Sequence, residues 1–143
     1  MSACKQQTPQ VTVDRGFYYW KSTFQLSTNE TTALQQLQVK KLYVKFFDVE
    51  WNEEQSSAQP VAKLSIDSAS LQQLKKQQIQ ILPVVFITNR TFLYIKKEEI
   101  HFLTQSINDL IKKKITDYHL NTAGEIQIDC DWTAGTRDDY FTF

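Results

Sequence analysis

The stretch GEIQIDCDWT, from Gly124 to Thr133, spaces its polar side chains as a strand that lines a site would. Residues two apart on a strand face the same way, so Gln127, Asp129 and Asp131 are expected on one face, and the apolar residues between them on the other. Neighbouring carboxylates can divide the roles of proton donor and proton acceptor between them. The alternative is that both aspartates accept hydrogen bonds from backbone amides or cap the following turn.

Three other expected strands also end in polar and aromatic residues, within YYWKS, FFDVEW and FITNR. The carboxyl ends of parallel strands meet at one edge, where aromatic rings can stack on sugars and carboxylates and amides can bind hydroxyl groups. The predicted catalytic residues are Asp48, Asp129 and Asp131, and the predicted substrate-binding residues are Trp20, Lys21, Glu50, Trp51, Asn89, Gln127 and Trp132. The alternative for the three tryptophans is packing in the core or against helices.

Apolar periodicity predicts the elements that must position these residues. Nearly continuous apolar runs predict strands at 16–24, 40–51 and 79–89, with a fourth strand after Gly124. Helical spacing predicts helices at 27–38, 67–78 and 96–118, and a further helix that opens near the end of the chain. Residues 52–63 are expected to form a polar loop, and Pro83 predicts a bulge or an edge position nearby. The alternation predicts an α/β fold with right-handed crossovers and a parallel sheet.

Four such βα units are half of a TIM-type (β/α)8 barrel, which typically needs about 250 residues. The polar run KQQTPQ, residues 5–10, predicts a flexible amino-terminal tether at residues 1–15. Residues 16–143 are then a partial barrel domain that is truncated at its carboxyl end. The alternative is an α/β interaction domain that is complete at Phe143 and closed by a short helix.

The composition argues against several classes of function. The 143 residues include 16 basic and 16 acidic side chains, so no whole-chain field attracts nucleic acid or anionic lipid. Two cysteines and two histidines are too few for a disulfide framework or a histidine-rich metal site. The three glycines are isolated and form no phosphate-binding motif. We expect no cofactor, no metal and no nucleic-acid partner, and we expect Cys130 to be a buried apolar residue.

The amino terminus carries a separate signal, the sequence SACK at residues 2–5. A pair of small residues before a cysteine resembles the end of a bacterial lipoprotein signal, and this resemblance implies lipidation at Cys4. It also implies a location in the cell envelope, with membrane contact only through that anchor. The alternative is an ordinary cytoplasmic start that contains a cysteine by chance.

The segment IDCDWT, Ile128 to Thr133, is similar to the fourth-strand signature of the family-18 chitinases, D-x-D-x-E, which ends a strand of a (β/α)8 barrel. Asp129, Asp131 and Trp132 match that signature. Thr133 stands where the family has its general acid, a glutamate. The resemblance therefore implies a barrel strand but does not carry over chitinase chemistry.

A broader likeness covers most of the chain, through FYYWKSTF, LYVKFFDVEW, ILPVVFITN and EIQIDCDWT. These runs resemble the amino-terminal half of glycosidase-like barrel lipoproteins of Bacteroides-type bacteria. The resemblance implies a glycoside-hydrolase-like barrel that acts on or binds carbohydrate. The alternative is a non-catalytic carbohydrate-binding or scaffold lipoprotein of the envelope, and whether the chain belongs to an enzyme stays open.

Overall fold

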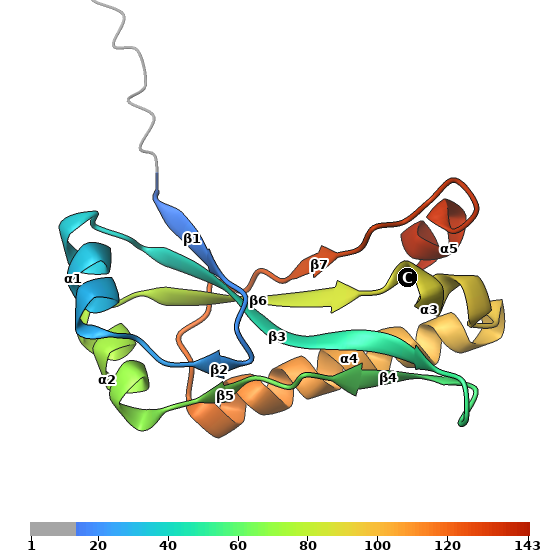
Figure 1. The fold of residues 1–143 in the computed structure, drawn as a ribbon, viewed down its shortest axis with the longest axis horizontal. Helices are drawn as coiled ribbons and strands as arrows, with labels where there is room; N and C mark the ends of the chain where they lie inside the picture. Colours follow the sequence, from blue (N-terminus) through green and yellow to red (C-terminus); the bar gives the residue numbers. More distant parts are fainter. Residues whose placement is uncertain (1–13) are drawn as a thin grey trace, which may run out of the picture.

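The computed structural model describes residues 14–143, in which strands and helices alternate along most of the chain (Figure 1). The strands are β1 (Gly16–Tyr19), β2 (Thr23–Phe24), β3 (Lys41–Asn52), β4 (Ser57–Val61), β5 (Ser65–Ile66), β6 (Gln80–Ile87) and β7 (Gln127–Asp129). The helices are α1 (Thr28–Gln36), α2 (Ser68–Lys76), α3 (Asn89–Tyr94), α4 (Lys97–Tyr118) and α5 (Arg137–Thr142). Nearly all of the predicted tether lies outside the described residues.

The main sheet has the order β1-β3-β6-β7, and each neighbouring pair in this order is parallel. Strand β4 folds back antiparallel against the carboxyl half of β3, on the edge whose amino half pairs with β1. Strands β2 and β5 form a small parallel pair of their own. The predicted α/β class with a parallel sheet is confirmed, and the sequential strand order is consistent with the first half of a (β/α)8 barrel.

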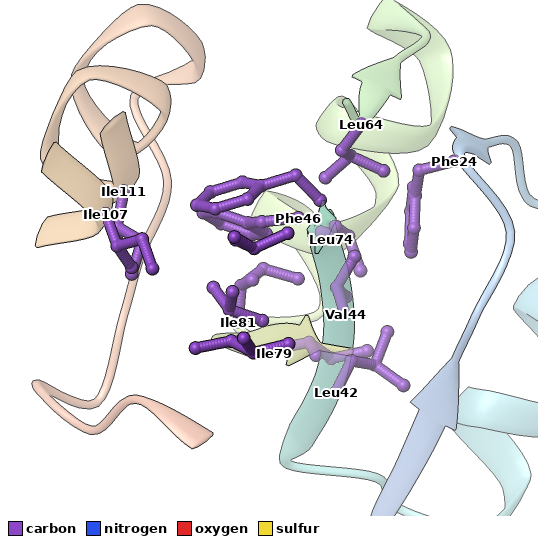
Figure 2. Packing of buried hydrophobic residues seen from close by; sticks show 14 of the residues in the cluster. Phe24, Leu42, Val44, Phe46, Leu64, Leu74, Ile79, Ile81, Ile107 and Ile111 are labelled. Carbon is purple, nitrogen blue, oxygen red and sulfur yellow. The ribbon is translucent and has the colours of Figure 1, made fainter. Parts of the chain in front are cut away.

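The helices of the described chain all contribute to one apolar cluster on one face of the sheet. Helices α1 to α5 contribute, in turn, Leu34, Leu74, Phe92, Ile107 and Tyr140. Figure 2 shows Ile107 and Ile111 of α4 pointing toward Phe46 of β3. A doubly wound sheet carries helices on both faces, so this one-sided arrangement differs from that fold and is consistent with the wall of a barrel.

The first two βα units begin and end their helices in similar ways. Ser27 and Glu30 form a reciprocal capping box at the start of α1, and the backbone amide of Ser27 lowers the pKa of Glu30. Asp67 caps α2 by accepting hydrogen bonds from two backbone amides. Both helices are followed by a left-handed residue, Gln38 (φ 52°) and Gln78 (φ 55°). The matched turns let β3 and β6 begin in register.

Strand β3 contains a β-bulge between Lys45 and Phe47. In a regular strand Lys45 and Asp48, three residues apart, would face opposite ways. The extra residue changes this, because Lys45 pairs with Val84 and Asp48 pairs with Phe86, two positions on β6 that share a face. The bulge therefore puts both charged side chains on the face away from the helices.

Several predictions of local structure are wrong. The strand expected at 16–24 is divided into β1 and β2, and β2 pairs with β5 instead of joining the main sheet. The loop expected at 52–63 contains β4, whose polar sequence is held in a strand by pairing with β3. The end of the strand expected at 79–89 is the start of α3. The bulge expected near Pro83 is present, although it lies on β3, the adjoining strand, and Pro83 itself is in a central strand.

Candidate functional site

The face of the main sheet turned away from the helices carries a set of polar and aromatic side chains, which we call the open face. Its position follows from strand register and from the alternation of side chains along each strand. It comprises Tyr18 of β1, Tyr43, Lys45 and Asp48 of β3, Leu82, Val84 and Phe86 of β6, Gln127 and Asp129 of β7, and Trp20, which follows β1. In a parallel barrel this face is the interior.

One hydrogen bond shows that the open face is concave. The Tyr18 hydroxyl donates to Gln127 Oε1 at 3.0 Å, although β1 and β7 are separated by β3 and β6. Three strand spacings are about 14 Å on a flat sheet, too far for these two side chains to meet. The curvature also explains why Leu82 and Val84, on the face without helices, are only 2% and 0% exposed.

Three aromatic rings form a platform on the β1 side of the open face. The ring of Tyr18 stacks on Tyr43 with centroids 4.7 Å apart and on Trp20 with centroids 5.9 Å apart. Gly16 permits this arrangement, because a Cβ at that position would lie 2.9 Å from the Tyr43 ring. Tyr18 and Trp20 are 53% and 44% exposed, so the platform leaves aromatic surface open to a ligand, while part of each ring face is covered by the ring stacked on it.

Two of the three predicted catalytic residues lie in one row of the open face. Asp48 pairs in register with Phe86, and Phe86 pairs with Asp129. Two strand spacings place the Cα atoms of the two aspartates about 10 Å apart. The row lies at the carboxyl ends of β6 and β7, where (β/α) barrels carry their sites. Gln127, a predicted binding residue, lies on the same face two residues earlier on β7.

Lys45 and Asp48 form an ion pair on the open face, with Nζ 2.9 Å from Oδ2. Both side chains are largely buried, at 16% and 15% exposure. The other oxygen, Asp48 Oδ1, is buried and accepts no hydrogen bond from the described residues. The pair therefore contains polar groups whose bonding capacity the described part of the chain does not fill.

Two predicted binding residues near these strands lie on the helix side. Trp51 is an odd number of residues from Asp48 and faces the other way, and its ring stacks on Tyr94 of α3 at 5.9 Å. The Lys21 ammonium lies over the ring of Tyr19, 5.8 Å from its centroid. Glu50 alternates with Asp48 on β3, is exposed, and lies beside β4. Of these, only Glu50 shares the face of Asp48.

The remaining predicted residues lie near α5. Asn89 Oδ1 accepts a hydrogen bond from the buried Thr136 hydroxyl, which ties the start of α3 to the loop before α5. Trp132 stacks on Tyr140 of α5, with centroids 6.3 Å apart. Asp131 is exposed in the coil after β7, because that strand ends at Asp129. The structure thus ties Asn89 to the loop before α5 and Trp132 to α5, and Asp131 lies beyond the paired part of β7.

Cys130 is partly buried against the apolar cluster on the helix side. Burial, with smaller effects from the neighbouring charges of Asp131 and Asp129, raises its pKa to about 11. A thiol with so high a pKa is protonated at neutral pH and is a poor nucleophile. The predicted role of Cys130 as a packing residue agrees with this environment.

Sequence reasoning missed Tyr18, Tyr43 and Lys45. The signal was present, because Tyr43 and Lys45 alternate with the buried Leu42 and Val44. A lysine inside an otherwise apolar strand indicates that its side of the strand faces away from the apolar cluster. The bulge concealed its partnership with Asp48, since a spacing of three residues does not indicate a shared strand face.

Comparisons with protein-family models, curated proteins and solved structures find no match to the chain. In residues 14–143, no group of three or more His, Cys, Asp or Glu side chains is arranged to hold a metal ion. No helix in that range is long and apolar enough to cross a bilayer. The predicted lipidation site, Cys4, lies outside the described residues.

Proposed function

We propose that this chain contributes the carbohydrate-binding face of a glycoside-hydrolase-like barrel. The observation that carries the proposal is the aromatic platform of Tyr18, Tyr43 and Trp20, two of whose rings are exposed. The Tyr18–Gln127 hydrogen bond joins it to a polar row on the same concave face. Pyranose rings present C–H surfaces that stack on aromatic rings, and their hydroxyls bind carboxylates and amides. A face that offers both kinds of group suits such a ligand.

Binding of disaccharides is the direct test. Saturation-transfer NMR on the 143-residue chain with cellobiose, maltose, lactose, chitobiose and mannobiose is expected to detect at least one ligand. Trp20→Ala and Tyr18→Ala are expected to weaken that binding about tenfold, since each removes a stacking surface. Trp132→Ala is the matched comparison, because Trp132 is similarly exposed but packs against α5. Unchanged affinity in both platform variants would contradict the proposal, as would no binding by the unmodified chain.

Hydrolysis is a second candidate, favoured by the row that holds Asp48 and Asp129. In inverting glycosidases the two carboxyl groups are about 6.5–9.5 Å apart, which leaves room for a water molecule. Side chains rising from Cα atoms about 10 Å apart on a concave face can reach that spacing. Asp129→Asn tests it when made in the protein encoded by the complete gene and assayed on a disaccharide that binds. Lost turnover with retained binding favours an enzyme, and no turnover by either protein favours the non-catalytic binder.

An envelope location through a lipid anchor at Cys4 remains part of the proposal and rests on the SACK sequence. Mass spectrometry of the protein isolated from its native cells is the test. Diacylglyceryl modification of Cys4 would support the anchor. An unmodified Cys4 in a protein recovered from the cytoplasm would support the alternative.

A further inference from the structure

The β-bulge in β3 creates one specific contact, the ion pair of Lys45 and Asp48 on the open face. Bulges are frequent next to functional sites, where they re-aim a side chain. Here the extra residue, Phe46, is fully buried on the helix side, and the register shift turns Asp48 toward Lys45. Without the shift, the two side chains would lie on opposite faces of the sheet.

The ion pair of Lys45 and Asp48 is expected to add little to the free energy of unfolding. Removing two charges from water costs free energy that a single salt bridge often fails to recover, and well-packed apolar replacements are often neutral or stabilising. The cost is greater here because Asp48 Oδ1 is buried without a hydrogen-bond donor in the described part of the chain. Groups that break local rules of stability are expected at functional sites.

The Lys45 ammonium has bonding capacity to offer a ligand. It has three donors, and within residues 14–143 one of them is used, in the bond to Asp48 Oδ2. Lys45 pairs in register with Val84, which pairs with Gln127, so the ammonium belongs to the row next to Asp48 and Asp129. Tyr43, part of the aromatic platform, lies two residues earlier on the same face.

We propose that Lys45 is a ligand-binding residue of the open face, held in place by Asp48, and that its ammonium donates hydrogen bonds to hydroxyl oxygens of a sugar stacked on the aromatic platform. Asp48 is then a positioning residue, which fixes the direction of the ammonium through Oδ2. This inference rests on the proposed carbohydrate-binding function. It adds that sugar recognition depends on a cation placed by the bulge.

The test replaces the pair with apolar residues of similar size, Lys45→Met with Asp48→Leu, and measures both stability and binding. Urea unfolding is expected to show stability equal to or above that of the unmodified chain. Saturation-transfer NMR with the same five disaccharides is expected to show at least a tenfold loss of affinity. The matched control is Lys113→Met with Asp117→Leu, an exposed ion pair on α4, which is expected to leave affinity unchanged.

The outcomes separate this inference from the proposed function. If the unmodified chain binds a disaccharide and the double variant binds it equally well, Lys45 is not a binding residue, while the aromatic platform can still be one. If the double variant loses stability as well as binding, the pair is structural and the inference fails. Binding of none of the five sugars by the unmodified chain overturns both. Lys45→Arg keeps the positive charge and the donors, and it is expected to retain part of the affinity that the double variant loses.

Discussion

The two faces of the main sheet are built from the same strands, yet they carry different kinds of side chain. On the helix side, Val44, Phe46 and Phe47 of β3 are fully buried in the apolar cluster. On the open face, Tyr43 and Lys45 of the same strand lie among partly exposed aromatic and charged groups. The difference teaches that stability and ligand binding can be tested separately within one short stretch of sequence.

The largest expected effect is on the helix side. Phe46→Ala removes a fully buried ring and leaves a cavity in the cluster, so the free energy of unfolding is expected to fall by about 3–5 kcal/mol. Tyr18→Ala on the open face is expected to cost only about 1–2 kcal/mol, because 53% of that residue is already exposed and it loses one hydrogen bond and two stacking contacts. Urea denaturation of both variants measures the contrast. Equal losses would show that the faces do not differ as described.

The alkylation rate of the Cys130 thiol tests whether this residue lies on the buried helix side of the sheet. Its pKa of about 11, against an ordinary 9.0, lowers the thiolate fraction at neutral pH about 100-fold. In a Cys4→Ser variant, Cys130 is the one remaining cysteine. At about neutral pH, its alkylation by iodoacetamide should be about 100-fold slower in the folded chain than in urea. Similar rates in the two states would place the thiol in water and remove it from the helix side.

Lys114 is a buried lysine of α4 that donates to the Leu64 carbonyl at 2.8 Å. Burial lowers its pKa below the ordinary 10.5. Between the folded and the unfolded pKa, the unfolded chain binds more protons, so the contribution of Lys114 to stability rises with pH in that window. Below the window the charge is buried at a cost.

Replacing Lys114 by Met leaves the Leu64 carbonyl without its donor, at a cost of about 1–3 kcal/mol. At neutral pH that loss is partly offset, because the variant no longer buries a charge. Urea unfolding at neutral pH and near 10.5 should therefore show a greater loss at the higher pH. Lys113→Met, at an exposed neighbour, should show a small loss at both values. A loss that shrinks as the pH rises would contradict the assigned sign.

The main elements were predictable because each has a strong local signal. The helix predicted at 96–118 is present at Lys97–Tyr118, where isoleucines and leucines recur at helical spacing over 22 residues. The parallel sheet followed from the alternation of these helices with apolar strands. Strand β4 was not predictable, since Ser57–Val61 is polar and contains Pro60, and only its partner β3 makes it a strand.

The candidate site was predictable only where the strand alternation is regular. Gln127 and Asp129 share a face as expected, because both belong to β7. Asp131 was expected beside them, and it follows the last paired residue of β7, because strand ends are set by pairing and not by composition. Trp51 was grouped with Asp48 by closeness in sequence, although an odd spacing puts it on the other face. Lys45 is also an odd number of residues from Asp48, but the bulge between them puts both side chains on the same face.

The smallest expected effect concerns the hydrogen bond from Tyr18 to Gln127, which spans the open face. Tyr18→Phe keeps the stacking ring but removes the donor, so the free energy of unfolding should fall by only about 0.5–1.5 kcal/mol. Gln127→Glu keeps an acceptor at the same place and should retain the bond, so its stability should stay closer to that of the unmodified chain. A double-mutant cycle with Tyr18→Phe and Gln127→Ala, followed by urea unfolding, isolates the pair. Strictly additive effects would mean that the two side chains do not meet, and the concave shape of the face would lose its main support.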